Sequence, residues 1–322
     1  MKPVRLAIVG ATGMVGQTTL SILEEWKVPI SELSLFASTS GRSMTFRGEE
    51  IPVHGMQDRI EADYAILALS SDLSRDLAPM LAANGVRVID HSSAHRMNAA
   101  VPLVIPEINS HAMNSNVRLV ANPNCSASIV LMALAPLEKE IGLKRVIVST
   151  YQSVSGAGAS ACDELSAQIM DPSHAPQIFP CRVMGNVFPE IGPFESTNYT
   201  GEETKISQEI RKILERKDLH VSATAVRVPV NIGHAASVSV EMQRPFAVSE
   251  VAEALSSFSG LVFDARDYST PLDIAGKQDV RVGRVRIDSQ DKNWLHFWVV
   301  GDNLRKGAAS NAVQILQHWT TL

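Results

Sequence analysis

The chain contains 322 residues, with 45% hydrophobic and 20% charged side chains and a formal net charge of -5. This length is sufficient for two domains with separate cores, and the composition is that of an ordinary globular protein. The mildly acidic balance provides no basic surface for nucleic acid, and no apolar segment reaches the roughly 18–20 residues that span a membrane. We therefore expect neither nucleic acid nor a membrane as a partner.

The first half of the chain alternates short apolar segments with amphipathic ones, which is typical of β-α-β units that form a parallel sheet. Strands are predicted at 4–9, 33–38, 62–69 and 86–90, and helices at 16–26 and 73–85. After residue 142 the apolar segments become longer, alternating and β-branched, which is typical of a mixed or antiparallel sheet with one covered face. Strands are predicted there at 144–155, 218–230, 234–243 and 293–300, helices near 159–170, 202–216 and 248–258, and an ordered irregular loop at 171–201.

Three glycines, Gly10, Gly13 and Gly16, separate the first predicted strand from the first predicted helix. Glycine permits a tight turn and a close approach of backbone to a pyrophosphate, and the N–H groups at a helix start attract an anion. The spacing G-x-x-G-x-x-G differs from the usual G-x-G-x-x-G, so the interpretation as a dinucleotide site depends mainly on the position of the glycines between a strand and a helix. The segment predicts a dinucleotide site, and a glycine turn that serves only packing is the alternative.

The end of the second predicted strand, LFASTSGRS, indicates which dinucleotide binds. An NAD site usually has an acidic residue there that holds the ribose 2′-hydroxyl and would repel a 2′-phosphate. No carboxylate follows this strand directly, and Ser38, Thr39, Ser40 and Arg42 are available to a phosphate. NADP is therefore favoured, with a polar surface turn as the structural alternative.

Three cysteines, Cys125, Cys162 and Cys181, are too few for a disulfide framework and lack the spacing of metal ligands, so we expect a reducing cytoplasm and no bound metal. Cys125 differs from the other two because it follows Asn-Pro-Asn at the predicted start of a helix. A helix dipole and free N–H groups lower the pKa of a thiol and can hold an oxyanion. Taken alone, Cys125 fits a reactive or a packing role equally well, whereas Cys162 and Cys181 are interpreted as packing residues.

A second group of polar residues lies in VSATAVRVPVNIGHAASVSV. Arg227 lies in an apolar, alternating strand, where a guanidinium needs an anionic partner. His234 follows Gly233 in a turn before the next strand, where an imidazole can transfer protons near neutral pH. Each residue alone could be structural. Together with Cys125 they indicate a catalytic site.

The motifs GATGMVG, NPNCS, STYQSVSGAG, GEETKISQEIRKIL, SATAVRVPVNIGHA and VVGDNLRKGAA occur in the order found in aspartate-β-semialdehyde dehydrogenases. The chain resembles that family over nearly its whole length. The resemblance implies an NADPH-dependent reductive dephosphorylation of L-aspartyl 4-phosphate to L-aspartate 4-semialdehyde through a cysteine thioacyl intermediate. This reaction belongs to the biosynthesis of lysine, diaminopimelate, threonine, methionine and isoleucine.

The same resemblance implies roles for individual residues. Cys125 matches the nucleophile, His234 the acid–base group, and Gln152 the residue that orients the acyl intermediate. The matches to substrate-binding positions are Arg96 and Lys205 for phosphate, Glu202 for the ammonium group, Arg227 for the α-carboxylate, and Asn124. The residues expected at the cofactor are Gly10, Thr12, Gly13, Met14, Val15, Gly16, Ser38, Thr39, Ser40, Arg42, Ser155, Gly156 and Asn303. NAD remains an alternative cofactor, because Thr39 stands where the family often has an arginine.

The implied fold class is α/β, with a Rossmann-type dinucleotide-binding domain and a second α+β substrate and dimerisation domain built on a mixed sheet. We place the first domain at 1–124, with a C-terminal helix at 304–322 packing back on it, and the second at 125–303. A homodimer or a dimer of dimers is expected, acting on small molecules: aspartyl phosphate, aspartate semialdehyde and inorganic phosphate.

Two other functions remain open at the level of sequence. An N-acetyl-glutamyl-phosphate reductase uses the same cysteine chemistry with different residues around the nucleophile, and a nonenzymatic relative could retain the fold. The presence of Cys125, His234, Arg227 and Glu202 argues against loss of activity. A carboxylate at Glu202 favours a substrate with a free ammonium group over an acetylated one.

Overall fold

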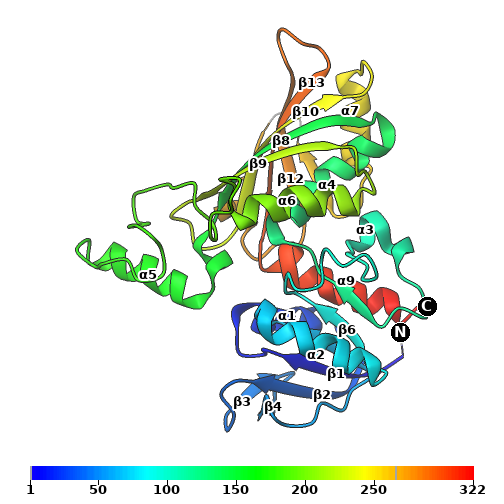
Figure 1. The fold of residues 1–322 in the computed structure, drawn as a ribbon, viewed down its shortest axis with the longest axis vertical. Coiled ribbons are helices and arrows are strands. Elements are labelled where there is room, and N and C mark those ends of the chain that lie inside the picture. The colour runs from blue at the N-terminus through cyan, green and yellow to red at the C-terminus, as the bar shows by residue number, and fades with distance from the viewer. Residues whose placement is uncertain (1, 265–266) are drawn as a thin grey trace. The chain divides into compact units, whose positions relative to one another are not determined.

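The computed structural model describes residues 2–264 and 267–322 (Figure 1). The chain forms two compact units, one made of the residues up to Pro123 together with Ala308–Leu322, and the other of Asn124–Gly307. Asn124 and residues 304–307 thus belong to the second unit, whereas the sequence pattern grouped them with the first. Among the described residues, no helix is long and apolar enough to cross a membrane.

Within the described residues, the first unit is built on a seven-stranded sheet of order β3-β4-β2-β1-β5-β6-β7. Its strands are β1 (Val4–Val9), β2 (Ile30–Ala37), β3 (Ser43–Phe46), β4 (Glu49–Gly55), β5 (Tyr64–Leu67), β6 (Arg87–Asp90) and β7 (Leu119–Ala121). Neighbouring strands are parallel except β3 and β4, which pair antiparallel at the edge. The predicted parallel sheet is confirmed, and β3, β4 and β7 are strands that the sequence pattern did not predict.

Helices cover both faces of this sheet, because its central strand β1 is apolar on both sides. The helices are α1 (Met14–Glu25), α2 (Ser71–Ala83), α3 (Pro106–Asn109), the 3-10 turn η1 (Ser110–Ala112) and α9 (Ser310–Trp319). Leu6 and Ile8 of β1 share a core with α1 and α9, whereas Ala7 and Val9 share a second core with α2. Since alternate side chains of a strand point to opposite faces, α1 and α9 lie on one face and α2 on the other.

The second unit is built, over its described residues, on a six-stranded mixed sheet of order β11-β12-β13-β10-β8-β9. Its strands are β8 (Leu143–Gln152), β9 (His220–Arg227), β10 (His234–Met242), β11 (Leu261–Asp264), β12 (Val280–Ile287) and β13 (Trp294–Gly301). β8 and β9 are parallel, and β10 is antiparallel to both β8 and β13. The predicted mixed sheet is confirmed, although β11 and β12 were not predicted.

One face of this sheet is covered by helices. The helices of the unit are α4 (Cys125–Glu140), α5 (Ala159–Met170), α6 (Gly201–Ile213), α7 (Val248–Ser256), α8 (Pro271–Ile274) and the 3-10 turn η2 (Val154–Ala157). α4 lies against β8, β10 and β13 between α6 and α7, and it is buried from Ser126 to Leu137. The opposite face is partly open, since Ile147 and Tyr151 of β8 are 42% and 37% exposed.

The segment between α5 and α6 is irregular, as predicted, and projects with α5 from the sheet of the second unit (Figure 1). Its order comes from two buried side chains of α5. The carboxylate of Glu164 accepts hydrogen bonds from the N–H groups of Gln177 and Ile178, and Oε1 of Gln168 accepts one from Val183. A long loop thus acquires a defined path without regular structure.

The last helix begins later than the predicted span 304–322, because a π-helical turn, η3 (Arg305–Ala309), precedes α9. Oδ1 of Asp302 accepts hydrogen bonds from the N–H groups of Leu304 and Arg305. The N–H of Gly307 bonds to the carbonyl oxygen of Asp302, five residues earlier. Such wider turns often occur at functional sites.

Candidate active site

The turn between β1 and α1 has the geometry of a phosphate site. Gly10 has a φ of +86°, and a Cβ there would lie 2.2 Å from the carbonyl oxygen of Ala68. A Cβ on Gly16 would lie 2.4 Å from the carbonyl oxygen of Gly10, so both positions require glycine. Gly13 precedes α1, and no side chain of the described residues caps this helix. The first N–H groups of α1 therefore suit an anionic ligand. Thr12, Met14 and Val15, half-buried, complete the turn.

The turn after β2 contains the residues predicted to bind the 2′-phosphate on the ribose. β2 ends at Ala37, and Ser38, Thr39, Ser40 and Arg42 are all exposed. None of residues 38–42 is acidic. The turn therefore offers hydroxyl groups and one cation to a ligand.

Arg96 lies in the loop after β6 and is only 8% exposed. Its Nε donates to the carbonyl oxygen of Asn122 at 2.9 Å, and its Nη2 donates to that of His91 at 2.6 Å. The neighbouring His95 has its Nε2 3.3 Å from the carbonyl oxygen of Ser74 in α2. The structure thus fixes Arg96 within the first unit through backbone contacts, and His95 ties the same loop to α2.

Three predicted residues meet at one end of the sheet of the second unit. Gln152 ends β8, Arg227 ends β9, and His234 begins β10. Gln152 pairs opposite Arg227 in the parallel register, and β10 runs antiparallel to β8. The end of β8 and the start of β10 therefore lie at the same end of the sheet, which brings together residues that are far apart in the sequence.

Cys125 is the first residue of α4, and its thiol is half-buried and not in a disulfide. Asn124 caps the helix, because its Oδ1 accepts hydrogen bonds from the N–H groups of Ser126 and Ala127 at 3.0 and 3.1 Å. A Cβ on Gly307 would lie 3.0 Å from Cβ of Cys125, so this glycine allows the chain to pass beside the cysteine. The predicted helix start is confirmed.

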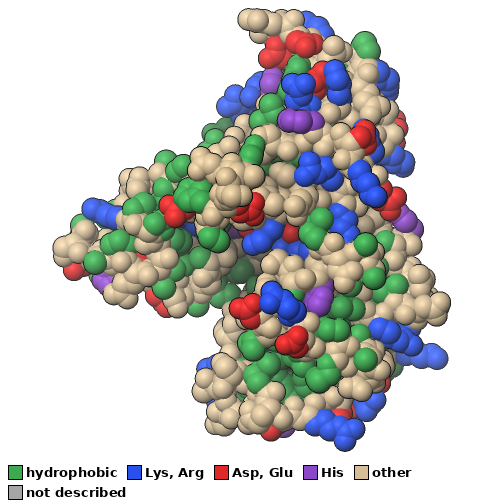
Figure 2. Space-filling view, viewed as in Figure 1, with side chains coloured by type: hydrophobic (Ala, Val, Ile, Leu, Met, Phe, Trp, Pro, Cys, Tyr) green, Lys and Arg blue, Asp and Glu red, His purple; other side chains and the backbone are tan. Residues whose placement is uncertain are grey.

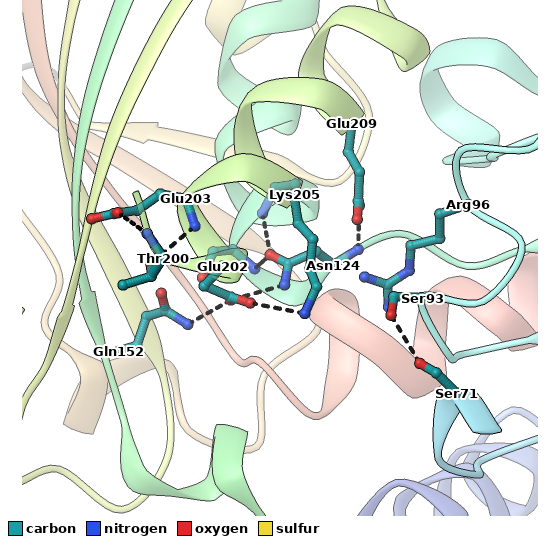
Figure 3. Close-up of polar contacts among 12 residues, drawn as sticks. Ser71, Ser93, Arg96, Asn124, Gln152, Thr200, Glu202, Glu203, Lys205 and Glu209 are labelled. Carbon is teal, nitrogen blue, oxygen red and sulfur yellow. Dashed lines mark hydrogen bonds and ion pairs between the residues drawn. The ribbon is translucent and has the colours of Figure 1, made fainter. Parts of the chain in front are cut away.

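Glu202 connects several predicted residues into one cluster (Figure 3). The residue is 8% exposed, and Oε1 of its carboxylate accepts hydrogen bonds from Nδ2 of Asn124 at 2.8 Å and Nε2 of Gln152 at 3.0 Å. The other oxygen, Oε2, lies 3.9 Å from Nζ of Lys205. Figure 3 shows the side chains of Asn124, Gln152 and Lys205 directed towards this carboxylate. A charged group thus lies next to the start of the helix that carries Cys125.

His234 is 1% exposed, and its two ring nitrogens have different surroundings. Nδ1 accepts a hydrogen bond from the backbone N–H of Ser153 at 3.1 Å, whereas Nε2 has no hydrogen-bond partner among the described residues. A Cβ on Gly156 would lie 3.1 Å from Nε2 and 3.3 Å from Nη1 of Arg227. Burial and then the charge of Arg227 lower the pKa of His234 to about 3, against a smaller opposing effect of the Gly233 carbonyl.

Arg227 is 4% exposed and donates from Nη1 to the carbonyl oxygen of Ser153 at 2.6 Å. Its Nε has no partner among the described residues, and its guanidinium carbon lies 5.5 Å from the ring centre of Phe179. Burial lowers the pKa of Arg227, whereas the charges of Glu202 and Cys125 raise it. The guanidinium therefore interacts electrostatically with both the carboxylate and the thiol.

Ser155 and Asn303, predicted near the nicotinamide, contact each other. Nδ2 of Asn303 donates to Oγ of Ser155 at 2.9 Å, and its Oδ1 accepts from the N–H of Gly233 at 2.8 Å and from Oγ of Ser153 at 3.1 Å. These bonds join the turn after β8 to the turn before β10. The side chains of Ser155 and Asn303 thereby support the backbone that holds His234.

Sequence reasoning missed three supporting residues, Ser153, Glu203 and Glu209. The Glu203 carboxylate closes the cap of α6 and accepts the N–H of Ala225 at 2.9 Å, which ties α6 to β9. The Glu209 carboxylate, 1% exposed, accepts the N–H of Asn124 at 2.6 Å. One signal was present, because Glu202 and Glu209 are two helical turns apart and share a face of α6.

The two other cysteines lie among apolar side chains, and the described residues contain no metal-binding cluster. Among the described residues, no group of three or more His, Cys, Asp or Glu side chains could hold a metal ion. Cys162 and Cys181 pack against a hydrophobic cluster that includes Val154 and Phe188, which confirms their packing role. Burial, followed by the charge of Asp163, raises the pKa of the Cys162 thiol.

Comparison with known proteins follows the same division of the chain. The family model described as "Semialdehyde dehydrogenase, NAD binding domain" matches residues 5–116. The model described as "Semialdehyde dehydrogenase, dimerisation domain" matches residues 134–306. The confirmed fold class is thus a two-domain α/β fold with a Rossmann-type sheet and a mixed sheet.

Individual relatives are similar over almost their full length. The aspartate-semialdehyde dehydrogenase of Aquifex aeolicus (strain VF5) is 41% identical over 97% of both chains. That of Bacillus subtilis (strain 168) is 40% identical over 97% of this chain and 96% of the relative. A crystal structure of aspartate semialdehyde dehydrogenase II from Vibrio cholerae, complexed with ASA, has a TM-score of 0.96 and 38% identity, covering 100% of this chain and 99% of that one. The chain therefore belongs to the aspartate-semialdehyde dehydrogenase family.

Proposed function

We propose that this chain catalyses the NADPH-dependent reductive dephosphorylation of L-aspartyl 4-phosphate to L-aspartate 4-semialdehyde, through a thioacyl intermediate on Cys125. The observation that supports the proposal is the cluster of polar side chains at one end of the sheet of the second unit. There the carboxylate of Glu202 bonds to Asn124, the residue before the nucleophile, and Arg227 interacts with both Glu202 and Cys125. The Vibrio cholerae relative, solved with ASA, supports the substrate class.

Cys125 supplies the nucleophile. Its thiolate attacks the carbonyl carbon of the acyl phosphate, so that a sulfur–carbon bond forms, the carbon–oxygen bond to phosphate breaks, and phosphate leaves with the electron pair. The start of α4 and the guanidinium of Arg227 are both positive and favour the thiolate. His234 is the acid–base group, and Gln152 orients the acyl group.

The charges around this cluster match those of aspartyl phosphate. Arg227 presents a planar guanidinium to the α-carboxylate, and Glu202 presents a carboxylate to the ammonium group. Lys205, about 42% exposed, and Arg96 are the cations proposed for phosphate. Asn124 positions Glu202 and therefore acts on the substrate indirectly.

The turn between β1 and α1 fits a dinucleotide, because Gly10 and Gly16 allow its backbone to pack tightly and no side chain of the described residues caps the first N–H groups of α1. The residues proposed to hold the cofactor are those of this turn, the exposed turn from Ser38 to Arg42, and Ser155, Gly156 and Asn303 near the nicotinamide. When bound, NADPH supplies a hydride. NADP is preferred over NAD because the turn after β2 has no acidic residue to repel a 2′-phosphate.

Cofactor preference is tested with Arg42→Ala. This variant should weaken NADP⁺ binding far more than NAD⁺ binding, because only NADP⁺ offers a phosphate to the guanidinium. Isothermal titration with both cofactors measures the two losses. Equal losses would show that Arg42 does not bind the 2′-phosphate.

The reaction itself is tested in the reverse direction, by following NADP⁺ reduction with aspartate semialdehyde and phosphate. Cys125→Ser should abolish turnover while retaining cofactor binding, because a serine hydroxyl lacks the nucleophilicity of a thiolate at neutral pH. N-acetyl-glutamate semialdehyde serves as the competing substrate. Its acetylated nitrogen has no charge to offer Glu202, so a preference for it would overturn the proposal.

A homodimer in the cytoplasm is also proposed. Exposed apolar side chains of the second unit favour association: Ile147, Tyr151, Ile169, Met170, Val187 and Phe194. Figure 2 shows hydrophobic side chains at the surface of the projecting part that contains α5. None of the three cysteines is in a disulfide, which suits a reducing compartment. Light scattering should give twice the chain mass of 34.9 kDa, a fourfold mass would indicate a dimer of dimers, and the chain mass alone would contradict association.

A further inference from the structure

The contact between Ser153 and His234 determines where the imidazole carries its proton. A backbone N–H can only donate, and the N–H of Ser153 lies 3.1 Å from Nδ1 of His234. Oγ of Ser153 is 3.0 Å from the same nitrogen. Neutral imidazole has one proton, so a ring that accepts at Nδ1 carries its hydrogen on Nε2.

We propose that Ser153 is a positioning residue that holds His234 as the Nε2–H tautomer. Of the acid–base role proposed above, His234 then takes the acid part: it enters the reaction as a hydrogen-bond donor, and it is not the base that deprotonates Cys125. This inference rests on the function proposed above for Cys125 and His234. It adds to that function the protonation state in which the resting enzyme meets its substrate.

The Nε2–H group is a buried donor that has no hydrogen-bond partner among the described residues. Nε2 would lie 3.1 Å from a Cβ on Gly156. Nη1 of Arg227 would lie 3.3 Å from the same Cβ. A buried donor without a partner is costly, so an oxygen that accepts from it binds favourably there. A side chain on Gly156 would crowd both Nε2 and Nη1, so glycine at this position avoids a close contact with the two donors.

A neutral donor is sufficient for the acylation step. When the thiolate sulfur bonds to the carbonyl carbon, the carbonyl electron pair moves to oxygen, and Nε2–H stabilises that charge through a hydrogen bond. As the pair returns, the carbon–oxygen bond to phosphate breaks and phosphate leaves with its electrons. No proton is transferred in this sequence, so His234 retains its hydrogen throughout.

The surroundings of the ring favour its neutral form. The groups facing it are the neutral Ser153, the cation Arg227, and the backbone of Gly233, whose smaller effect favours the charged ring. Arg227 in turn interacts with Cys125 and Glu202 from α4 and α6. A second positive charge on the ring would be unfavourable beside this guanidinium. The thiolate is instead supported by the start of α4 and by Arg227.

The direct test is nitrogen NMR of the full-length protein labelled with ¹⁵N-histidine, with the His234 signals assigned by their loss in His234→Gln. We expect an unprotonated Nδ1 and a protonated Nε2 throughout about pH 6–8, the range in which an ordinary histidine titrates. An Nδ1–H tautomer or an imidazolium in this range would overturn the inference. Because no turnover is needed, an inactive protein with the Nε2–H tautomer would support this inference and refute only the proposed function.

Two Ser153 variants separate the backbone donor from the hydroxyl. Ser153→Ala keeps the N–H, so the tautomer should be unchanged. Ser153→Pro removes the N–H donor together with the hydroxyl, and the native φ of -63° is one that proline adopts. An Nδ1–H signal should then appear. If a folded Ser153→Pro protein retained only the Nε2–H tautomer, the positioning role would be overturned. If the proline variant does not fold, the tautomer seen in the wild-type and Ser153→Ala spectra tests the inference instead.

The donor role is tested by comparing two amides at position 234. Glutamine can place an N–H group near the position of Nε2, whereas the shorter asparagine reaches only the region of Nδ1. His234→Asn should slow acylation on the order of 10²–10³-fold, the cost of one lost oxyanion donor, and His234→Gln should remain at least about tenfold faster than His234→Asn. Neither amide can act as a base. Equal losses in the two variants would therefore contradict the donor role.

Discussion

Three ionisable side chains of the site are nearly inaccessible to solvent, since Glu202, Arg227 and His234 are 8%, 4% and 1% exposed. Burial of a charge is costly unless hydrogen bonds or an opposite charge compensate it. Glu202 is compensated by two amide donors, and Arg227 by a backbone carbonyl and by nearby anionic groups. His234 avoids the cost by remaining neutral. Such perturbed groups concentrate where ligands bind.

Gly156 offers a prediction at this scale. In Gly156→Ala, the added methyl group would occupy the space beside Nε2 of His234 and Nη1 of Arg227. We expect kcat/KM to fall by up to about 10²-fold, the effect of a displaced reacting group. Gly201→Ala is the matched control, because its methyl group meets no atom closer than 3.9 Å. Steady-state kinetics compares the two, and unchanged kinetics in Gly156→Ala would show that substrate does not use this space.

At the scale of elements, the start of α4 combines two functions in one residue. Oδ1 of Asn124 caps the helix that carries Cys125, and Nδ2 of the same side chain holds Glu202. The stability of the element and the geometry of the site are therefore linked through a single amide. A variant that removes only one of the two contacts can separate the effect on helix stability from the effect on the site.

Asn124→Ala should lose both contacts, whereas Asn124→Ser should lose only the second. Serine is a good capping residue, so Asn124→Ala should be about 1 kcal/mol less stable than Asn124→Ser, while the loss of the donor to Glu202 is common to both. Both variants should lose activity, because Glu202 is released. Urea unfolding and kinetics are the measurements. A serine variant with full activity would show that the contact with Glu202 is not needed.

The irregular segment after α5 depends on Glu164, whose carboxylate accepts two backbone N–H groups. Glu164→Ala should release the segment and accelerate trypsin cleavage after the exposed Arg182 by about tenfold or more, the scale of a lost charged hydrogen bond. Glu164→Gln retains an acceptor oxygen and should remain close to wild type. Mass spectrometry of the fragments measures the rate. Equal cleavage of the alanine variant and wild type would contradict this role.

At the scale of the whole molecule, folding is linked to pH through His234. Its pKa is near 6.5 in an unfolded chain and about 3 in the folded one, so the unfolded chain binds more protons between these values. The free energy of unfolding should therefore fall as the pH decreases below about 6.5, and the contribution of His234 should be constant above that.

Between pH 7 and pH 5, this histidine should account for a loss of about 2 kcal/mol in wild type that is absent in His234→Asn. His91, whose pKa burial and Arg96 also lower to about 3, acts in the same direction but is common to both proteins. Urea titrations at the two pH values provide the difference. Identical pH dependence in the two proteins would contradict the neutral, buried state of His234.

The sequence by itself determined the elements whose signals are local. The apolar segment at 4–9 and the helical spacing at 159–170 predict β1 and α5 with the observed bounds. Asn124 before Cys125 predicts the start of α4, because a capping residue acts on its immediate neighbours. The order of the motifs was enough to identify the family. Each of these depends on residues close together in the chain.

The tertiary structure alone decided which distant residues meet. Alternation of apolar residues shows which face of a strand is buried, but it does not show which strand is its neighbour. The short strands β3 and β4 were not predicted, because pairing between them at the edge of the sheet stabilises them and their own sequence has no long apolar alternation. Ser153 and His234 lie 81 residues apart, and Asn124 and Glu202 lie 78 apart, so their hydrogen bonds exist only because the strand order and the packing of α4 and α6 bring them to one edge. The protonation state of His234 follows from that packing, because burial and the neighbouring donor act only in the folded chain.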